Sequence, residues 1–220
     1  MNEKVRKLVT MAMLAALSIV LVYVIHFPIF PAASFLEYDP ADIPILIGTF
    51  AYGPLAGVLL TVVVSVIQGM TVSSGSGLMG IAMHIFATSI LVLVAGNIYR
   101  VKHTKKGAVL GLACGVVCLV AVMLLWNYLI TPLYMTNFSR ADVAALLPTL
   151  FLPFNLAKGG MNMAATLLLY PPVVGALRRA GVVPPSQSGQ GKTLNAGFLL
   201  FALALLATFV AFALVLAGVI

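Results

Sequence analysis

Long apolar runs separated by short basic blocks are the feature that most limits what this chain can fold into. Only 8% of its 220 residues are charged, and its mean hydropathy is +1.15. Soluble domains carry nearer a quarter charged residues, so the composition indicates a protein that resides in lipid. Several runs approach the ~20 residues that a helix needs to cross a bilayer. We therefore predict an all-α polytopic membrane protein.

The apolar runs predict seven membrane spans, six before Pro184 and one after it. Their approximate ranges are 8–25, two spans within 43–70, 78–99, 108–131, 146–177 and 196–220. The run 43–70 divides at Gly53–Pro54, because the residue before a proline avoids helical geometry. The second span would then have only about a dozen residues, too few to cross a ~30 Å core unaided. We expect Asp42 to be its N-cap.

The chain is predicted to have three parts. Residues 1–183 would form a six-helix membrane domain, and residues 196–220 an extra transmembrane helix. Residues 184–195, which contain Pro, Ser and Gly, would be a flexible linker. The last apolar run carries no ionisable side chain and no polar stripe, so nothing marks it as part of a binding site.

Basic residues set the expected orientation. The net charge is +7, and most of the basic side chains lie in three blocks: Lys4, Arg6 and Lys7; Arg100, Lys102, Lys105 and Lys106; Arg178, Arg179 and Lys192. The positive-inside rule places all three blocks, and so the N-terminus, in the cytoplasm. This requires an even number of crossings between successive blocks, which the division at Gly53–Pro54 supplies. We read the charge as an orientation signal and expect no nucleic-acid partner.

No enzymatic or metal-binding pattern emerges from the sequence. Cys114 and Cys118 lie four residues apart without a nearby histidine or carboxylate, so we expect free thiols and no metal site. There is no zinc motif, phosphate-binding loop or Ser-His-Asp set. We therefore predict a protein that is not an enzyme and carries no cofactor, and any active transport would need a separate motor subunit.

A polar stripe marks the sixth span. Four residues share one helical face, at positions i, i+3, i+4 and i+7: Asn155, Lys158, Gly159 and Asn162. A charge deep in an apolar helix costs roughly 2.5–3.5 kcal/mol on insertion scales, unless it meets a polar cavity or a partner. Two interpretations stay open for Lys158. It faces a ligand, or it forms a structural pair with Asp39, Asp42 or Glu37.

Further candidates lie near the outer ends of other spans. Asn127, Thr131 and Tyr134 follow helical spacing on the fifth span and would face the Lys158 stripe if the two spans are neighbours. On the fourth span His84 lies beside Met83. A lone histidine among apolar residues is more often a hydrogen-bonded core residue, but we include both as candidate binding residues. The aromatic loop 26–39 carries too much apolar surface for water and is expected to fold back as an external lid.

Three blocks of the chain resemble a known family. They are FLEYDPADIP at 35–44 with Gly48 and FAYGP at 50–54, Asn127 with PLY at 132–134, and PFNLAKG at 153–159. Together they are similar to the riboflavin-specific S component of energy-coupling factor (ECF) vitamin transporters, over about residues 1–183. The resemblance implies a six-helix subunit of the bacterial plasma membrane that captures riboflavin from outside. A transmembrane T component and two ATPases would energise its release inward.

The resemblance also implies roles for individual residues. Asn155 and Lys158 would hold the polar edge of the isoalloxazine ring, and Asn127 would lie near the ribityl chain. The first outer loop would cover the pocket through Leu36, Glu37, Tyr38 and Asp39. Ala12 and Ala16 match the alanine motif that docks on the T component. The seventh span departs from the six-helix pattern of the family.

Three other readings remain. The same architecture could serve another vitamin, such as folate, thiamin or pantothenate. Lys158 could be the base or nucleophile of an intramembrane enzyme, since buried lysines shift their pKa readily. The chain could also be a purely structural membrane scaffold.

Overall fold

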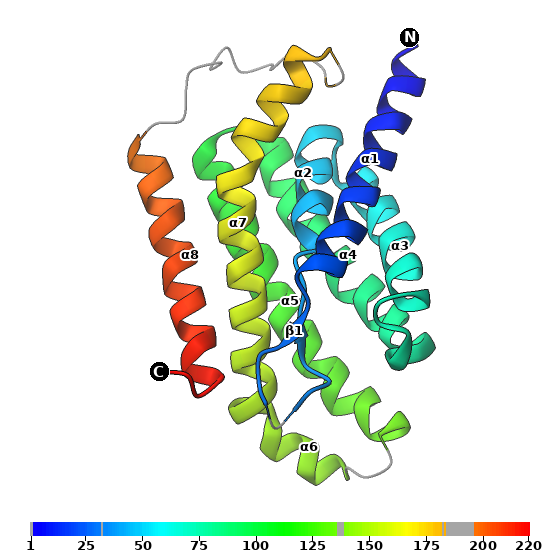
Figure 1. Cartoon of the computed structure of the whole chain (residues 1–220), viewed down its shortest axis with the longest axis vertical. Coiled ribbons are helices and arrows are strands. Elements are labelled where there is room, and N and C mark those ends of the chain that lie inside the picture. The colour runs from blue at the N-terminus through cyan, green and yellow to red at the C-terminus, as the bar shows by residue number, and fades with distance from the viewer. Residues whose placement is uncertain (1, 32, 136–138, 182, 184–195) are drawn as a thin grey trace.

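The fold is a bundle of long helices that run roughly along one axis (Figure 1). This computed structural model describes residues 2–31, 33–135, 139–181, 183 and 196–220. The elements are α1 (Glu3–Val24), β1 (Phe27–Pro28), β2 (Glu37–Tyr38), α2 (Asp42–Tyr52), α3 (Pro54–Met70), η1 (Ser74–Ser76), α4 (Gly77–Lys102), α5 (Lys105–Tyr134), α6 (Arg140–Leu146), η2 (Leu147–Phe151), α7 (Leu152–Arg179) and α8 (Ala196–Leu216). The predicted linker 184–195 lies outside the described residues.

Among the described residues, five segments are long and apolar enough to cross a membrane: Glu3–Val24, Ser74–Lys102, Lys105–Tyr134, Arg140–Arg179 and Ala196–Leu216. The helices Asp42–Tyr52 and Pro54–Met70 are shorter but also apolar. The prediction of an all-α polytopic membrane protein is confirmed.

The predicted division of the run 43–70 is confirmed. α2 ends at Tyr52, α3 begins at Pro54, and Gly53 between them has φ of +95°. A side chain is strongly disfavoured at that φ, whereas glycine adopts it freely. Proline fits the first turn of α3 because an N–H at that position would have no helical partner.

The loop between α1 and α2 explains how an 11-residue helix fits the bundle. β1 pairs antiparallel with β2, and this hairpin lies below α2 in the view of Figure 1, so α2 starts partway along the bundle. The Ser18 hydroxyl of α1 donates a hydrogen bond to the Ala41 carbonyl over 3.0 Å, inside the protein. The loop therefore occupies the length that a full transmembrane helix would have filled.

Asp42 differs from its predicted role. It is the first residue of α2, and the N-cap is Ala41, which makes no side-chain capping bond. The Asp42 carboxylate instead accepts hydrogen bonds from Thr88 of α4 over 2.9 Å and from Asn162 of α7 over 3.2 Å. The N-cap prediction was wrong because partners from distant helices bind the carboxylate more favourably than the local backbone does.

The connection between the predicted spans 108–131 and 146–177 contains further helix. α5 continues through Pro132 to Tyr134. α6 begins at Arg140 behind a Ser139–Asp142 capping box, and one π turn, η2, joins it to α7. The span predicted over residues 146–177 is thus preceded by a further short helix.

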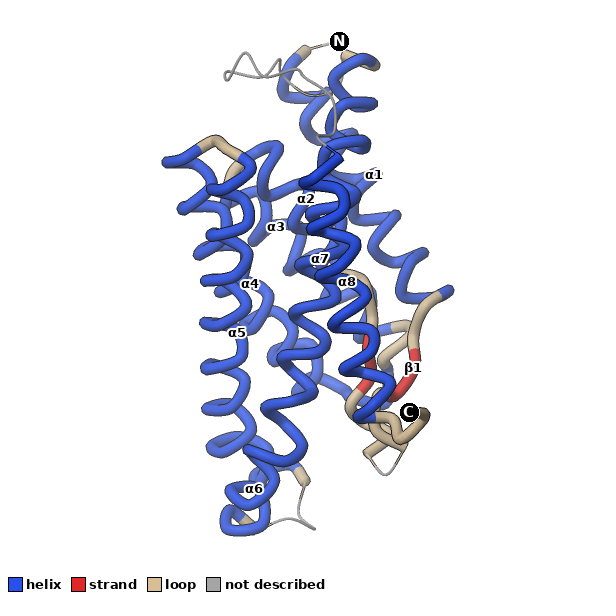
Figure 2. Tube along the Cα trace, turned by 90° about the vertical axis from the view of Figure 1, so that its left-hand side faces the viewer, coloured by secondary structure: helices blue, strands red, loops and turns tan. Residues whose placement is uncertain are grey.

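The described residues of the three basic blocks gather at one end of the bundle. The N-terminus and the end of α7 share this end in Figure 1, and Figure 2 shows the α4–α5 turn there as well. The hairpin and α6 lie toward the opposite end. This arrangement is the one that the even numbers of crossings between basic blocks require.

Candidate functional site

A cavity of about 560 Å³ lies between the α1–α2 loop and helices α3, α4, α5 and α7. Eight of the ten predicted binding residues line it: Leu36, Glu37, Asp39, Met83, His84, Asn127, Asn155 and Lys158. The volume falls within the range of roughly 300–1,000 Å³ that is typical of small-molecule sites. Residues from segments far apart in the sequence therefore meet around one ligand-sized space.

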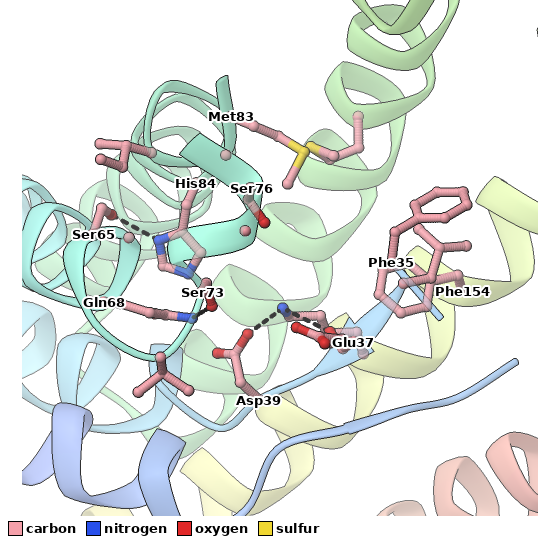
Figure 3. Close-up of a pocket in the computed structure, with 18 of the residues that line it drawn as sticks. Phe35, Glu37, Asp39, Ser65, Gln68, Ser73, Ser76, Met83, His84 and Phe154 are labelled. Atoms are coloured by element: carbon pink, nitrogen blue, oxygen red, sulfur yellow. Dashed lines mark hydrogen bonds and ion pairs between the residues drawn. The ribbon is translucent and has the colours of Figure 1, made fainter. Parts of the chain in front are cut away.

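The cavity has two chemically distinct ends (Figure 3). Ser65, Gln68 and His84 lie toward one end, and the rings of Phe35 and Phe154 lie toward the other. A site of this kind accommodates a molecule with one flat apolar part and one polar part.

Lys158 forms the central polar contact. Its Nζ lies 2.6 Å from Oδ2 of Asp39 and donates a second hydrogen bond to the Glu37 carbonyl over 3.4 Å. Its side chain is 19% exposed and that of Asp39 is 6% exposed. The sequence left two interpretations open, a ligand-facing lysine and a structural ion pair. In the structure Lys158 pairs with Asp39 and also lines the cavity. An ammonium has three N–H groups, so the pair does not exhaust its donors.

Asp39 is held as a carboxylate. Burial by itself would raise its pKa, but the Lys158 charge and the hydrogen bonds from Lys158 and the Ala41 amide outweigh it, and the pKa lies below its usual value. The Ala41 amide donates to Oδ1 of Asp39 over 3.2 Å. Both carboxylate oxygens are thus bonded, one to α7 and one to the residue that precedes α2.

A polar network continues below the ion pair. The Asn162 amide donates to the Asp39 carbonyl over 3.3 Å and to Oδ2 of Asp42 over 3.2 Å. Nδ1 of His84 lies 2.7 Å from the Ser65 hydroxyl, and its Nε2 lies 3.8 Å from Oδ1 of Asp42. His84 is therefore both a hydrogen-bonded interior residue and part of the cavity wall.

On α7 and α5 the two asparagines are anchored within their own helices. Asn155 donates to the Phe151 carbonyl over 2.7 Å, and Asn127 donates to the Met123 carbonyl over 2.7 Å. Each amide group is thereby held in one orientation beside the cavity. On the loop, Oε2 of Glu37 lies 2.8 Å from Nε2 of His26.

Two predicted binding residues do not line the cavity. Thr131 is buried and donates a hydrogen bond to Oδ1 of Asn127 over 3.0 Å. It therefore supports a cavity residue without lining the cavity itself. Tyr38 is buried in the apolar cluster under the loop, with its ring 5.4 Å from that of Phe27. Burial, together with the nearby charges of Asp39 and Asp42, raises the pKa of Tyr38 and keeps it neutral.

Sequence reasoning missed the polar end of the cavity. Gln68 and Ser65 of α3 line it, together with Ser73 and Ser76 of the α3–α4 connection. Oε1 of Gln68 and Nε2 of His84 are buried with no hydrogen-bond partner among the described residues. Ser65 and Gln68 are three apart in an apolar helix, which is the same signal that singled out Asn155 and Lys158.

The glycines beside Lys158 serve helix packing. A Cβ at Gly159 would lie 2.9 Å from a methyl group of Val116 on α5, and one at Gly160 would overlap the ring of Phe209 on α8. Gly159 and Gly160 therefore allow α5 and α8 to pack closely against α7, and neither glycine faces the cavity.

The apolar helices, the loop folded into the bundle and the cavity lined by both apolar and polar side chains define a membrane protein with a small-molecule site. The sequence matches the family described as ECF transporter, substrate-specific component, over residues 6–170. The chain belongs to this family. A solved structure described as the S component of a bacterial ECF transporter has a TM-score of 0.68 and 28% identity, covering 80% of this chain and 99% of that chain.

Several relatives carry a more specific name. The riboflavin transporter RibU of Staphylococcus aureus (strain TCH60) is 32% identical over 179 residues, which cover 79% of this chain and 93% of that protein. RibU of Streptococcus thermophilus (strain ATCC BAA-250 / LMG 18311) is 34% identical over 76% of this chain and 82% of its own length. The riboflavin transporter FmnP of Bacillus subtilis (strain 168) is 29% identical over 71% and 85%, respectively.

The ion pair predicts a specific pattern of stability. Asp39→Asn or Lys158→Met alone should lower the free energy of unfolding by about 3–5 kcal/mol, because each leaves one buried charge without its partner. The loss in the free energy of unfolding of the double variant should be clearly smaller than the sum of the losses of the two single variants. The measurement is unfolding of the purified chain in detergent.

The matched control is Glu37→Gln, which removes the more exposed His26–Glu37 contact in the same loop. We expect a loss of only about 0–1 kcal/mol there. Additive losses from Asp39→Asn and Lys158→Met would contradict a coupled pair.

Proposed function

We propose that this chain is the riboflavin-binding subunit of an ECF transporter, and that it captures the vitamin from outside the cell. The observation that carries the proposal is the convergence of Asn155, Lys158 and Asn127 on one cavity. The names of the relatives and the membership of the S-component family support riboflavin as the ligand.

The chemistry of the cavity suits riboflavin. Its flat ring system has an apolar edge, which the rings of Phe35 and Phe154 complement, and a carbonyl-rich edge, which Asn155 and Lys158 can bind. The hydroxylated tail would lie toward Asn127 and the polar end formed by Ser65, Gln68 and His84. Oε1 of Gln68 and Nε2 of His84, which have no hydrogen-bond partner among the described residues, would then gain hydrogen bonds from the ligand.

The loop would cover the bound vitamin. Leu36, Glu37 and Asp39 line the cavity from the loop, and Lys158 holds two of them through the Asp39 carboxylate and the Glu37 carbonyl. The ligand and the loop would therefore share the same lysine, which couples loop position to ligand binding.

The contacts of Lys158 weigh against the enzyme reading. A nucleophilic lysine must lose its proton, whereas this ammonium lies 2.6 Å from a carboxylate that stabilises the charged form. The family is one of transporter components rather than of enzymes. Another vitamin, such as folate, thiamin or pantothenate, remains the competing ligand assignment.

Flavin titration of the purified full chain tests the proposal. We expect quenching of riboflavin fluorescence on binding and no comparable affinity for folate, thiamin or pantothenate. Asn155→Ala should weaken riboflavin binding by about 1–3 kcal/mol, because a polar group of the ligand would be left unpaired.

The matched control for this variant is Asn97→Ala. Asn97 donates to the Leu93 carbonyl four residues earlier over 2.8 Å, as Asn155 does to that of Phe151, but it lies outside the cavity. It should leave riboflavin affinity unchanged. A chain that binds no flavin, or that binds another vitamin more tightly, would refute the assignment.

We further propose that Ala12 and Ala16 on α1 dock this subunit onto a T component that carries two ATPases. Both alanines are exposed, whereas Ala15 and Ser18 of the same helix are buried against the bundle. Small residues four apart let a partner helix approach closely within a membrane. Uptake then needs the partner, since the described residues contain no feature that would hydrolyse ATP.

Substitution of both positions tests this docking face. Ala12→Leu with Ala16→Leu should abolish co-purification with the T component and uptake into cells, while riboflavin binding by the isolated chain persists. The control is Ala204→Leu with Ala207→Leu, at two exposed positions on α8. Unimpaired assembly of the α1 variant would exclude this face as the docking site.

We also propose that the N-terminus is cytoplasmic. The described residues of the three basic blocks gather at one end of the bundle, and the positive-inside rule assigns that end to the cytoplasm. The cavity and its loop would then open toward the outer side. An epitope tag at Met1 should become accessible to antibody only after the cells are permeabilised, and labelling of intact cells would reverse the assignment.

A further inference from the structure

α8 lies beyond the residues 6–170 that match the family, yet it is packed against the bundle. It runs beside α7 in both Figure 1 and Figure 2. One side of it contacts the protein, and the other side exposes large apolar residues, including Leu200, Phe201 and Leu203. α8 therefore has one side packed on the bundle and one apolar side that faces outward.

The inward side of α8 has a regular pattern. Six residues that pack into the apolar clusters follow the spacing 4-3-4-3-4: Phe198, Ala202, Leu205, Phe209, Phe212 and Leu216. This spacing is typical of two helices that interlock side chains along a shared seam. Ala202 is fully buried. The pattern extends over almost the whole helix, so α8 docks along its length.

Gly160 of α7 provides a socket for α8. A Cβ at this position would overlap the ring of Phe209, so only glycine leaves room for it. At the other end of α8, Nζ of Lys105 lies 5.4 Å from the ring centre of Phe198, a cation–π contact with the start of α5. These two contacts define where α8 sits on the bundle.

The outer half of α8 shares an apolar cluster with the loop over the cavity. Residues of the loop, η2, α6, α7 and α8 meet there, among them Leu36 and Tyr38 of the loop, Phe154 of α7, and Phe209 and Phe212 of α8. Leu36 and Phe154 also line the cavity. The cluster therefore joins α8 to the cavity wall.

We infer that α8 braces the loop in its closed position over the ligand, with Phe209 in the Gly160 socket as the positioning contact. This inference rests on the proposed function only in taking the loop as the cover of a bound vitamin. Apolar packing from α8 stabilises the same cluster that holds Leu36 and Tyr38 in place. Loosening α8 then lets the loop open more often, and the ligand leaves faster.

The first test compares two phenylalanines of α8 in the full-length chain. Riboflavin-loaded protein is diluted, or mixed with an excess of a non-fluorescent competitor. The rate at which flavin fluorescence returns is the release rate. Phe209→Ala should release riboflavin roughly tenfold faster, since variants of one complex differ mostly in their dissociation rates. Phe201→Ala makes the same change on the exposed side of the helix and should leave the rate unchanged.

A second pair of variants separates bracing from general destabilisation. Gly160→Ala places a Cβ against the Phe209 ring and should also speed release. In Gly160→Ala combined with Phe209→Ala the ring is gone, so release should be no faster than in Phe209→Ala alone. Equal riboflavin release rates for Phe209→Ala and Phe201→Ala would overturn the inference. So would a release rate in the Gly160→Ala, Phe209→Ala double variant that rises by the product of the two single effects.

A third readout needs no ligand. The Ile29 amide donates to the Leu36 carbonyl over 3.2 Å, and the Leu36 amide donates to the Ala33 carbonyl over 2.9 Å. Hydrogen exchange of these amides in the ligand-free chain should be faster in Phe209→Ala than in Phe201→Ala. If the wild-type chain binds no riboflavin, the proposed function fails, and this exchange alone decides whether α8 braces the loop. Unchanged exchange would refute the brace.

Discussion

The contact between Lys158 and Asp39 organises the half of the bundle that holds the hairpin and the cavity. An ammonium inside an apolar helix is tolerated only when a partner or a polar space meets it. Here the partner comes from the α1–α2 loop, so the loop has to enter the bundle. Asp39 also accepts from the Ala41 amide, and the Ala41 carbonyl accepts from Ser18 of α1. One ion pair thus links α7, the loop, the start of α2 and α1.

The shortness of α2 follows from the same constraint. Since the loop reaches down to Lys158, α2 begins partway along the bundle, and its residues from Asp42 to Phe50 are all buried. The space that a longer helix would have filled is left to the hairpin and the cavity. Polar atoms at the edge of this space, such as Oε1 of Gln68, lack a hydrogen-bond partner among the described residues. Unsatisfied buried groups are uncommon in proteins, and a ligand with hydroxyl groups would satisfy them.

Sequence reasoning succeeded where a residue was unusual for its surroundings. Lys158 and Asn155 stood out because they are polar within an apolar run, and both line the cavity. Ser65 and Gln68 gave the same signal in a shorter run and were overlooked. Thr131 and Tyr38 could not be separated from true cavity residues, because spacing defines a helical face but not how deeply a neighbour covers it. The local rule for N-caps failed at Asp42, since Thr88 and Asn162 are distant in sequence.

Hydropathy and charge can be summed along a sequence without knowing which residues touch. They were enough to predict the membrane class, the division of the run 43–70 and the clustering of the basic blocks at one end. Contacts between distant residues do not add in this way. Lys158 and Asp39 are 119 positions apart, and the docking of Phe209 on Gly160 depends on two helices joined by a segment with no apolar pattern. Only the tertiary structure decided that Lys158 both pairs with a carboxylate and borders a cavity, because several helices and a loop must pack together before either contact exists.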